Sequence, residues 1–328
     1  METKKRIFSG MRPTGKLHLG NYFGALSNWV RLQDTYQCVY AVVDWHALTT
    51  GYEDTSGIRE NVYEMALDWL AAGLDPERSI IFVQSHVKQH AELHLLLSMV
   101  TPLGWVERVP TYKEQLRELA GREIATYGFL GYPVLQAADI LAYKAEGVPV
   151  GEDQVPHVEL TREIARRFNH FFGPIFPEPE TLLTHVKLLP GVDGRKMSKS
   201  YGNEIAMTAS SDEIRNKVMN LVTDPERIHR TDPGHPDVCI AYKFYEAIAQ
   251  ETATGVSEEC RNAKVGCVQC KRRLFDLLEA FIAPLRERRE EYAKDPDFVR
   301  NILAEGASRA QVIAEATLNE CREAMKLW

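Results

Sequence analysis

The stretch from Phe8 to Asn21, FSGMRPTGKLHLGN, constrains the fold more than any other part of the chain. It begins as a buried strand end at residues 6–9 and opens a helix at His18, and a turn rich in glycine and proline joins the two. The helix places apolar side chains on one face, so its N-terminus is held against the ends of a sheet. Free N–H groups and the helix dipole favour a phosphate there. The stretch therefore predicts a nucleotide site.

Two kinds of phosphate-binding loop resemble this stretch. Gly10 and Gly15-Lys16 approach a Walker A loop, but Leu17 lacks the hydroxyl that magnesium needs and Pro13 lacks an N–H donor. The other is the H-x-G-N signature of class I aminoacyl-tRNA synthetases, in which a histidine lies beside the phosphates and the glycine leaves room for adenine and ribose. By itself this signature is weak, because an ordinary strand, turn and capped helix explains it equally well.

A second segment, RKMSKSYGN at residues 195–203, follows the glycine-rich PGVDG. Lys196 and Lys199 are interleaved with hydroxyls on a loop, where two ammonium groups can surround a triphosphate. A short basic run is more often a solvated loop. KMSKS in this form is nevertheless specific. Together with H-L-G-N it makes the chain resemble a class I aminoacyl-tRNA synthetase.

Alternating segments predict an α/β fold. Residues 37–44 and 79–84 are short β-rich runs that each follow a helical stretch, which predicts a Rossmann-like parallel sheet with right-handed crossovers. Ligands then belong at the carboxyl ends of the strands, near Gly10, residues 44–46 and Ser85. We expect a catalytic domain over residues 1–205, with a helical insertion at about 90–130. An all-helical domain that binds the tRNA anticodon is expected over residues 206–328, and its first helix starts at Ser210.

The composition fits a soluble two-domain protein. The chain has 328 residues, 45% hydrophobic and 26% charged, and no apolar run approaches the ~18 residues of a membrane span. The N-terminus lacks a signal-peptide core, so we expect a cytoplasmic protein without a membrane partner. The net charge of −7 does not itself suggest nucleic acid. Three basic clusters are either local RNA contacts or solvated helix faces: Arg162, Arg166 and Arg167; Lys271, Arg272 and Arg273; and Arg286, Arg288 and Arg289.

The helix predicted over residues 131–143, GYPVLQAADILAY, is almost entirely apolar, yet four polar side chains share one of its faces. They are Tyr132, Gln136, Asp139 and Tyr143. A carboxylate buried in such a helix must be paired. An arginine or a helix N-terminus could satisfy it. In a nucleotide-binding fold, the stripe looks more like a pocket wall for an aromatic substrate with one N–H group.

Here the resemblance narrows. The string Y-P-x-L-x-A-A-D-I-L, with GEDQ at 151–154, RFN at 167–169 and VVDWHALT at 42–49, is similar to tryptophanyl-tRNA synthetases of the bacterial type over roughly the first two hundred residues. The resemblance implies that L-tryptophan reacts with ATP and Mg²⁺ and passes to tRNA(Trp), and that the insertion mediates a homodimer. Tyrosyl-tRNA synthetase, and a non-catalytic relative that binds RNA or an amino acid, are the alternatives.

The resemblance also implies roles for individual residues. Asp139 would accept the indole N–H, with Phe8, Tyr132 and Gln136 around the ring, and His46 and Gln154 at the amino-acid end. His18, Lys196 and Lys199 would be the catalytic cations at the phosphates. Many members of the family have Gln where this chain has Arg12, and Met where it has Gln136. The implied ATP site comprises Arg12, Pro13, Thr14, His18, Gly20, Asn21, Gly151, Glu152, Asp153, Leu188, Lys196, Met197, Ser198, Lys199 and Ser200.

Four of the six cysteines lie within 32 residues, as Cys239-x20-Cys260-x6-Cys267-x2-Cys270. In a cytoplasmic chain disulfides are not expected, so these are metal ligands or unrelated thiols. Zinc sites usually have two C-x2-C pairs, whereas this chain has one, and the uneven spacing suits an iron–sulfur cluster better. A minority of tryptophanyl-tRNA synthetases carry a four-iron cluster in this region. The resemblance therefore implies a [4Fe–4S] cluster, with zinc as the alternative.

Overall fold

The computed structural model describes residues 4–118, 125–183 and 189–328. Within them, five parallel strands form one sheet in the order β3-β2-β1-β4-β5, which confirms the predicted Rossmann-like fold. The pairing of β1 with β2 runs from Arg6 opposite Gln37 to Met11 opposite Val42. The strand order reverses at β1, between β2 and β4, and such a reversal opens a crevice for ligands. The strands are β1 (Arg6–Met11), β2 (Gln37–Val42), β3 (Ser79–Val83), β4 (Gly147–Val150) and β5 (Glu180–Leu183).

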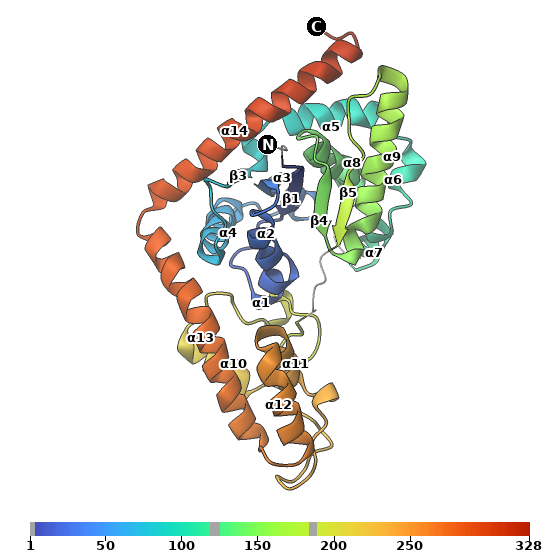
Figure 1. The fold of residues 1–328 in the computed structure, drawn as a ribbon. Coiled ribbons are helices and arrows are strands. Elements are labelled where there is room, and N and C mark those ends of the chain that lie inside the picture. Colours follow the sequence, from blue (N-terminus) through green and yellow to red (C-terminus); the bar gives the residue numbers. More distant parts are fainter. Residues whose placement is uncertain (1–3, 119–124, 184–188) are drawn as a thin grey trace.

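Helices cover both faces of the sheet (Figure 1). Successive strand residues point to opposite faces, so Phe8 packs among side chains of α5, α8 and α9, whereas Ile7 packs among those of α2 and α4. The helices of this part are α1 (Leu19–Asn21), α2 (Ser27–Leu32), α3 (Asp44–Gly51), α4 (Ile58–Ala72), α5 (Gln89–Val100), α6 (Leu103–Val106), α7 (Pro110–Glu118), α8 (Tyr127–Leu141) and α9 (Val155–Phe172). Short 3₁₀ turns lie at η2 (Gln84–His86) and η3 (Glu152–Gln154).

The segment after His18 was predicted as one helix but has three parts. A π-helical stretch, η1 (Tyr22–Leu26), separates α1 from α2. The predicted apolar face still packs inward, with Leu26 and Trp29 buried, and the Trp29 ring stacks on Tyr40 of β2 at a centroid distance of 4.7 Å. The first turn is thereby anchored to the sheet, which positions the H-L-G-N residues.

A helical region follows the sheet. It contains α10 (Ser211–Met219), α11 (Ile240–Ile248), α12 (Gln250–Arg261) and α13 (Cys267–Ala293), with 3₁₀ turns at η4 (Lys199–Tyr201) and η5 (Pro236–Val238). The predicted start of α10 is confirmed, because Ser210 and Glu213 form a reciprocal capping box. None of the helices within the described ranges combines the length and the apolar character that a membrane crossing requires.

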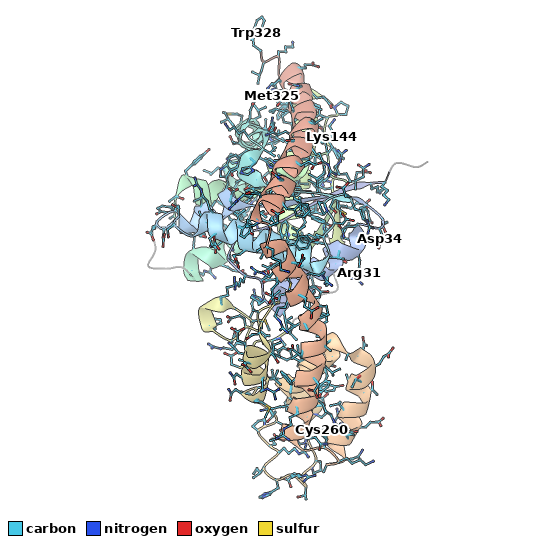
Figure 2. All side chains as sticks on the ribbon, turned by 90° about the vertical axis from the view of Figure 1, so that its left-hand side faces the viewer. Arg31, Asp34, Lys144, Cys260, Met325 and Trp328 are labelled. Atoms are coloured by element: carbon cyan, nitrogen blue, oxygen red, sulfur yellow. The ribbon has the colours of Figure 1, made fainter. Side chains whose placement is uncertain are left out.

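The last helix, α14 (Pro296–Ala324), leaves the helical region and runs back along the sheet (Figure 1). In the side view, Cys260 lies at one end of the molecule, and Met325 and Lys144 lie towards the other (Figure 2). The helix packs against β3 so closely that a Cβ at Gly306 would lie 1.9 Å from the carbonyl oxygen of Ile81. Only glycine fits at this crossing. The helical region and the sheet are thus tied together by α14.

Candidate active site

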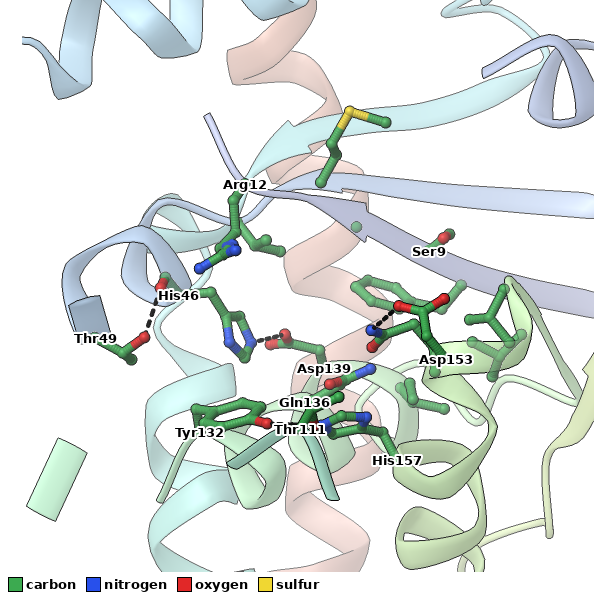
Figure 3. Close-up of a pocket in the computed structure, with 18 of the residues that line it drawn as sticks. Ser9, Arg12, His46, Thr49, Thr111, Tyr132, Gln136, Asp139, Asp153 and His157 are labelled. Carbon is green, nitrogen blue, oxygen red and sulfur yellow. Dashed lines mark hydrogen bonds and ion pairs between the residues drawn. The ribbon is translucent and has the colours of Figure 1, made fainter. Parts of the chain in front are cut away.

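A cavity of about 470 Å³ opens at the carboxyl ends of β1, β2 and β4, where the topology predicted a ligand. It contains the six residues to which the family resemblance gave a role at the aromatic substrate (Figure 3). Arg12 reaches into it from the end of β1, and Asn21 and Asp153 also line it. The six assigned residues are Phe8 from β1, His46 from α3, Tyr132, Gln136 and Asp139 from α8, and Gln154 from η3.

Asp139 is the most constrained side chain of the cavity, with 1% of its surface exposed. Its Oδ2 atom lies 2.8 Å from Nε2 of His46, and its Oδ1 atom accepts from Nε2 of Gln84 at 2.7 Å and lies 2.6 Å from Nδ1 of His90. Burial alone would raise the pKa of Asp139, but hydrogen bonds from His46 and His90 outweigh it and lower this pKa to about 2. The carboxylate is therefore ionised and held in one orientation.

Gln84 and His90 were not predicted from the sequence. Gln84 directly follows β3, so the rule that ligands gather at strand ends would have found it, whereas nothing local marks His90. His90 is fully buried, and its Nε2 lies 2.6 Å from the hydroxyl of Tyr143. Tyr143, predicted as part of the pocket wall, does not line the cavity. It lies beyond the end of α8 and stacks behind Phe8 at a centroid distance of 5.5 Å.

A second polar group at the cavity wall joins three elements. The hydroxyl of Tyr132 lies 2.9 Å from both Oγ1 of Thr111 and Nε2 of His157. Burial lowers the pKa of His157 to about 4, so the ring is neutral at neutral pH. Its buried Nδ1 atom has no hydrogen-bond partner among the described residues. The group fixes the Tyr132 ring, which lies beside Phe129 at 5.5 Å.

The two phosphate signatures meet. The ammonium of Lys199 donates to the carbonyl oxygen of Thr14 at 2.5 Å, and the backbone N–H of Gly20 points to Sδ of Met197 at 3.4 Å. Leu19 and Met197 share one apolar cluster with side chains of α10, α11 and α13. A Cβ at Gly20 would lie 2.9 Å from Nδ1 of His18, so here the glycine makes room for the imidazole. The two signatures therefore form one structural unit.

Asn203, buried to 2% exposure, shapes the KMSKS loop. Its Oδ1 accepts from the N–H of Ser198 at 2.8 Å, and its Nδ2 donates to Oδ1 of Asp193 at 2.8 Å and to the carbonyl oxygen of Lys196 at 3.1 Å. The side chains of Lys196 and Lys199 remain exposed at the surface. One buried amide thus sets the backbone of the loop while its two ammonium groups stay accessible.

His18 was expected to be a cation, and the structure makes it neutral. Burial and, to a smaller extent, the charge of Lys199 lower the pKa of His18 to about 4, while Glu204 opposes both. The Nδ1 atom of the His18 ring accepts the backbone N–H of Asn21 at 3.3 Å, so the ring caps α1. The backbone N–H of His18 in turn donates to Oδ1 of Asn21. The proton of the neutral ring is therefore on Nε2, which can donate to a phosphate oxygen.

The other assigned ATP residues are spread around these two segments. Pro13 is buried in the turn after β1, and Gly151 and Glu152 follow β4, where Gln154 donates to Oδ2 of Asp153 at 2.8 Å. Partial desolvation in the cavity lowers the pKa of Arg12, whose side chain is still exposed at the surface, while Tyr132 opposes this shift. Leu188 lies outside the described residues, and only the backbone of Ser200 is described, within η4.

The four cysteines gather at the far end of the helical region, where none forms a disulfide. Burial and the nearby Cys239, Cys260 and Cys267 together raise the pKa of Cys270 to about 11, against a hydrogen bond with Tyr245 that lowers it. Cys260 has Nη1 of Arg227 at 3.7 Å from its sulfur. Across the described ranges, no three or more His, Cys, Asp or Glu side chains are arranged to hold a metal ion. The expected metal centre is therefore not formed by the side chains as they stand.

The basic clusters are mostly engaged within the protein. Arg166 pairs with Glu159, Glu163 and Glu178, and Arg273 pairs with Glu259. Arg289 is only 13% exposed and pairs with Asp68 and Glu64 of α4. Each member of the third cluster bonds to protein atoms, and Arg286 and Arg289 are partly buried, whereas Arg288 remains exposed to solvent.

Comparison with known proteins defines the class. Residues 1–283 match the family model described as tRNA synthetases class I (W and Y), which covers both signature segments and the whole sheet. A solved tryptophanyl-tRNA synthetase from Campylobacter jejuni, complexed with ADP and tryptophan, has the same fold with a TM-score of 0.88. It is 34% identical, and the match covers 98% of this chain and 100% of that one.

Curated relatives show which class I synthetases the chain resembles closely in sequence. A tryptophan–tRNA ligase of Thermotoga maritima is 52% identical over 325 residues, covering 98% of this chain and 99% of the relative. Another, from Aquifex aeolicus, is 44% identical and covers 98% and 100%. A tyrosyl-tRNA synthetase of Archaeoglobus fulgidus shares only the fold, at 20% identity and a TM-score of 0.68. The chain belongs to the tryptophan–tRNA ligase family of class I synthetases.

Proposed function

We propose that this chain is an enzyme that activates L-tryptophan with MgATP and transfers it to tRNA(Trp). The observation that carries the proposal is the ionised, buried carboxylate of Asp139 at the wall of a cavity that adjoins the paired H-L-G-N and KMSKS segments. A carboxylate fixed in an apolar wall can accept one N–H of an aromatic ring. Such a site disfavours rings without that N–H, because Oδ2, which accepts only from His46 among the described residues, would keep one buried lone pair without a donor.

The chemistry requires positioning rather than a strong base. The tryptophan carboxylate is already ionised, and its oxygen forms a bond to the α-phosphorus of MgATP as the bond to pyrophosphate breaks. Lys196 and Lys199 supply positive charge where negative charge develops, and neutral His18 donates from Nε2. The 3′-terminal ribose of the tRNA then takes the acyl group from the adenylate, and AMP leaves.

The assigned residues divide between the two substrates. Phe8, Tyr132 and Gln136 surround the indole ring, and His46 and Gln154 face the amino-acid end. Arg12 and Asn21 line the cavity on the side of the first signature, which suits the junction between tryptophan and the α-phosphate. The remaining ATP contacts come from residues 13–20, 151–153 and 196–200, with Leu188 at the adenine.

ATP–pyrophosphate exchange tests the proposal directly. Tryptophan should drive incorporation of labelled pyrophosphate into ATP, and tyrosine should not. Exchange with tyrosine alone would reassign the cavity to a phenol. Exchange with neither amino acid, by protein that still binds tryptophan, would favour the non-catalytic alternative.

A homodimer is the proposed assembly. Large apolar side chains are exposed on α5, α6 and the start of α8: Leu95 by 52%, Met99 by 69%, Leu103 by 59% and Tyr127 by 76%. The three helices pack together through α8, and exposed apolar surface on adjoining elements is typical of protein–protein contacts. Met99→Glu should shift the mass measured by light scattering towards the monomer. Val312→Glu is a matched control, because Val312 is 73% exposed but belongs to α14, which carries none of these four side chains.

The helical region is the proposed site for the tRNA anticodon, in a protein that works in the cytoplasm. At its far end, exposed apolar side chains lie in sequence close to the four cysteines: Ile228 by 79%, Val238 by 60% and Val268 by 55%. Exposed bases can stack on such side chains, and Arg227 and Arg230 are nearby for phosphates. Ile228→Asp should weaken charging of tRNA while leaving tryptophan activation intact.

Cys239, Cys260, Cys267 and Cys270 are the proposed ligands of a [4Fe–4S] cluster, with a structural zinc ion as the alternative. Four free thiols within electrostatic reach of one another supply the donor set of either centre. Either group would hold η5 and the ends of α12 and α13 together. Protein purified without oxygen should be brown, with about four iron and four sulfide per chain. Colourless protein with one zinc would identify the alternative, and metal-free protein would exclude both.

A further inference from the structure

Arg289 of α13 reaches across from the helical region into the layer beneath the sheet. Its Nε donates to Oδ1 of Asp68 at 2.8 Å, and its Nη2 pairs with the carboxylate of Glu64. Both acidic residues belong to α4, which packs along α13. Arg288 makes a different contact with the same helix, donating from Nε to the carbonyl oxygen of Ala71 at 2.7 Å. Two neighbouring arginines thus bond α13 to α4. Arg289 bonds to side chains of α4, whereas Arg288 bonds to a backbone oxygen.

Asp68 is completely buried and connects Arg289 to the nucleotide site. Its Oδ2 accepts the backbone N–H of Leu17 at 2.6 Å. Leu17 directly precedes His18, and its carbonyl oxygen accepts the N–H of Met207 at 2.8 Å. Both backbone groups of residue 17 are therefore held, one by Asp68 and the other by the segment after KMSKS. The first residue before the H-L-G-N signature has little freedom to move.

The energetics make each partner necessary to the other. Burial raises the pKa of Asp68, whereas the N–H of Leu17 and the guanidinium of Arg289 lower it. A buried ionised carboxylate without its cation is strongly unfavourable. The same carboxylate also acts on Lys199: partial desolvation where the ammonium contacts Thr14 lowers the pKa of this otherwise exposed side chain, and Asp68 raises it. Removing Arg289 would therefore disturb both the backbone at residue 17 and the charge near the KMSKS lysine.

We propose that Asp68 and Arg289 are a positioning pair, through which helix α13 holds the H-L-G-N segment in place for the triphosphate of ATP. Neither residue lines the substrate cavity, so they act through Leu17 and His18. The pair makes the phosphate end of the site dependent on the helical region, while the amino-acid end is held by α8 and α5. The inference rests on the proposed tryptophan activation and deepens it.

The test compares Arg289→Met with Arg288→Met in ATP–pyrophosphate exchange. Arg289→Met should lower kcat and raise KM for ATP, with a combined loss in kcat/KM on the order of 10- to 100-fold, as expected when a phosphate-binding segment is misplaced. KM for tryptophan should stay within about twofold, because the cavity is unaffected. Arg288→Met, which removes a bond between the same two helices, should leave both kinetic constants near the parental values.

Two further variants separate positioning from stability. Arg289→Lys keeps a cation beside Asp68 and should recover part of the loss. Asp68→Asn keeps the volume but has only one acceptor for two donors, so it should reproduce the KM effect for ATP. Thermal unfolding of each variant, together with tryptophan binding by equilibrium dialysis, shows whether the cavity remains folded. If Arg289→Met cannot be purified folded, Asp68→Asn carries the same test.

The outcomes are distinct. Parental kcat and KM for ATP in folded Arg289→Met and Asp68→Asn proteins would overturn the positioning role. An equal loss in Arg288→Met would also overturn it, because the effect would then come from general packing of α13 on α4. If the parental protein itself fails to exchange with tryptophan, the proposed function fails instead.

Discussion

The two ends of the candidate site are built differently. At the amino-acid end, Asp139 is buried and bonded to three side chains from three different elements, His46, Gln84 and His90. At the phosphate end, the two lysines of KMSKS are exposed, and Lys199 bonds to a single backbone oxygen, that of Thr14. One end is a rigid acceptor fixed by packing. The other is a set of charges on a loop, held mainly through its backbone.

This difference matches what each end must do. Recognition of a ring N–H requires an acceptor that cannot turn away or gain a proton, which burial and hydrogen bonding provide. Binding and releasing a triphosphate requires cations that can move with the loop. Asn203 fixes the loop backbone locally, while Asp68 and Arg289 hold the segment opposite. We therefore expect substitutions at the two ends to have separable effects on binding and on chemistry.

The largest effect is expected at the rigid end. Asp139→Ala would remove the acceptor for the indole N–H and leave His46 and His90 without their shared partner. Loss of one member of a buried charged network should lower kcat/KM for tryptophan by on the order of 10³-fold. Exchange kinetics with varied tryptophan measure it. A variant that still activates tryptophan at the parental rate would exclude Asp139 from substrate recognition.

The next largest effect is expected at the phosphate end. Lys199→Ala or Lys196→Ala would remove an ammonium group that meets charge developing on the phosphates, so kcat should fall on the order of 10²- to 10³-fold. The dissociation constant of tryptophan should change little, because neither lysine lines the cavity. Single-turnover adenylate formation and equilibrium dialysis measure the two quantities. Weaker tryptophan binding with an unchanged chemical step would contradict the division between the two ends.

The sequence predicted the parts with strong local signals and missed those that depend on tertiary packing. The parallel sheet, the capped helix at Ser210 and the shared face of Tyr132, Gln136 and Asp139 followed from periodicity and capping residues. His90 was missed because its partner lies 49 positions away. The pair of Asp68 and Arg289 is separated by 221 positions, and Arg289 was interpreted as part of a surface cluster. The fold buries the side chains of Arg289 and His18, which the sequence alone does not show. Arg289 is therefore not part of a surface cluster, and His18 is neutral rather than a cation.

The pH dependence of stability should distinguish the two ends further. Burial lowers the pKa of both His157 and His18 from 6.5 to about 4. Between pH 6.5 and 4 the unfolded chain therefore binds more protons than the folded chain, so the free energy of unfolding decreases as pH falls through this window. For His157, which is 1% exposed, the loss should be on the order of 2 kcal/mol by pH 5.

Urea unfolding of the parental protein, His157→Gln and His18→Gln at pH 7 and pH 5 measures these losses. Above pH 5 few carboxylates titrate, so histidines dominate the change. The decrease should be smaller in His157→Gln than in the parental protein. His18→Gln should reduce it less, because His18 is only partly buried. An equal decrease in all three proteins would show that neither imidazole is kept neutral by folding.

The smallest effect on tryptophan activation is expected from Cys267→Ser, at the opposite end of the molecule from the sheet. Cys267 begins α13, whereas Arg289, which bonds to Asp68, lies 22 positions further along the same helix. Loss of one thiolate would weaken the proposed cluster or zinc site, loosen the ends of α12 and α13, and reduce aminoacylation of tRNA(Trp). The second half of α13 packs on α4, so the phosphate segment should keep its position and ATP–pyrophosphate exchange should stay near the parental rate.

Parallel assays of exchange and aminoacylation compare the two activities. Cys321→Ser is the control for loss of a buried thiol elsewhere. If Cys267→Ser abolished exchange while the sheet remained folded, α13 would transmit disorder along its whole length, and the two ends of the site could no longer be treated as separable.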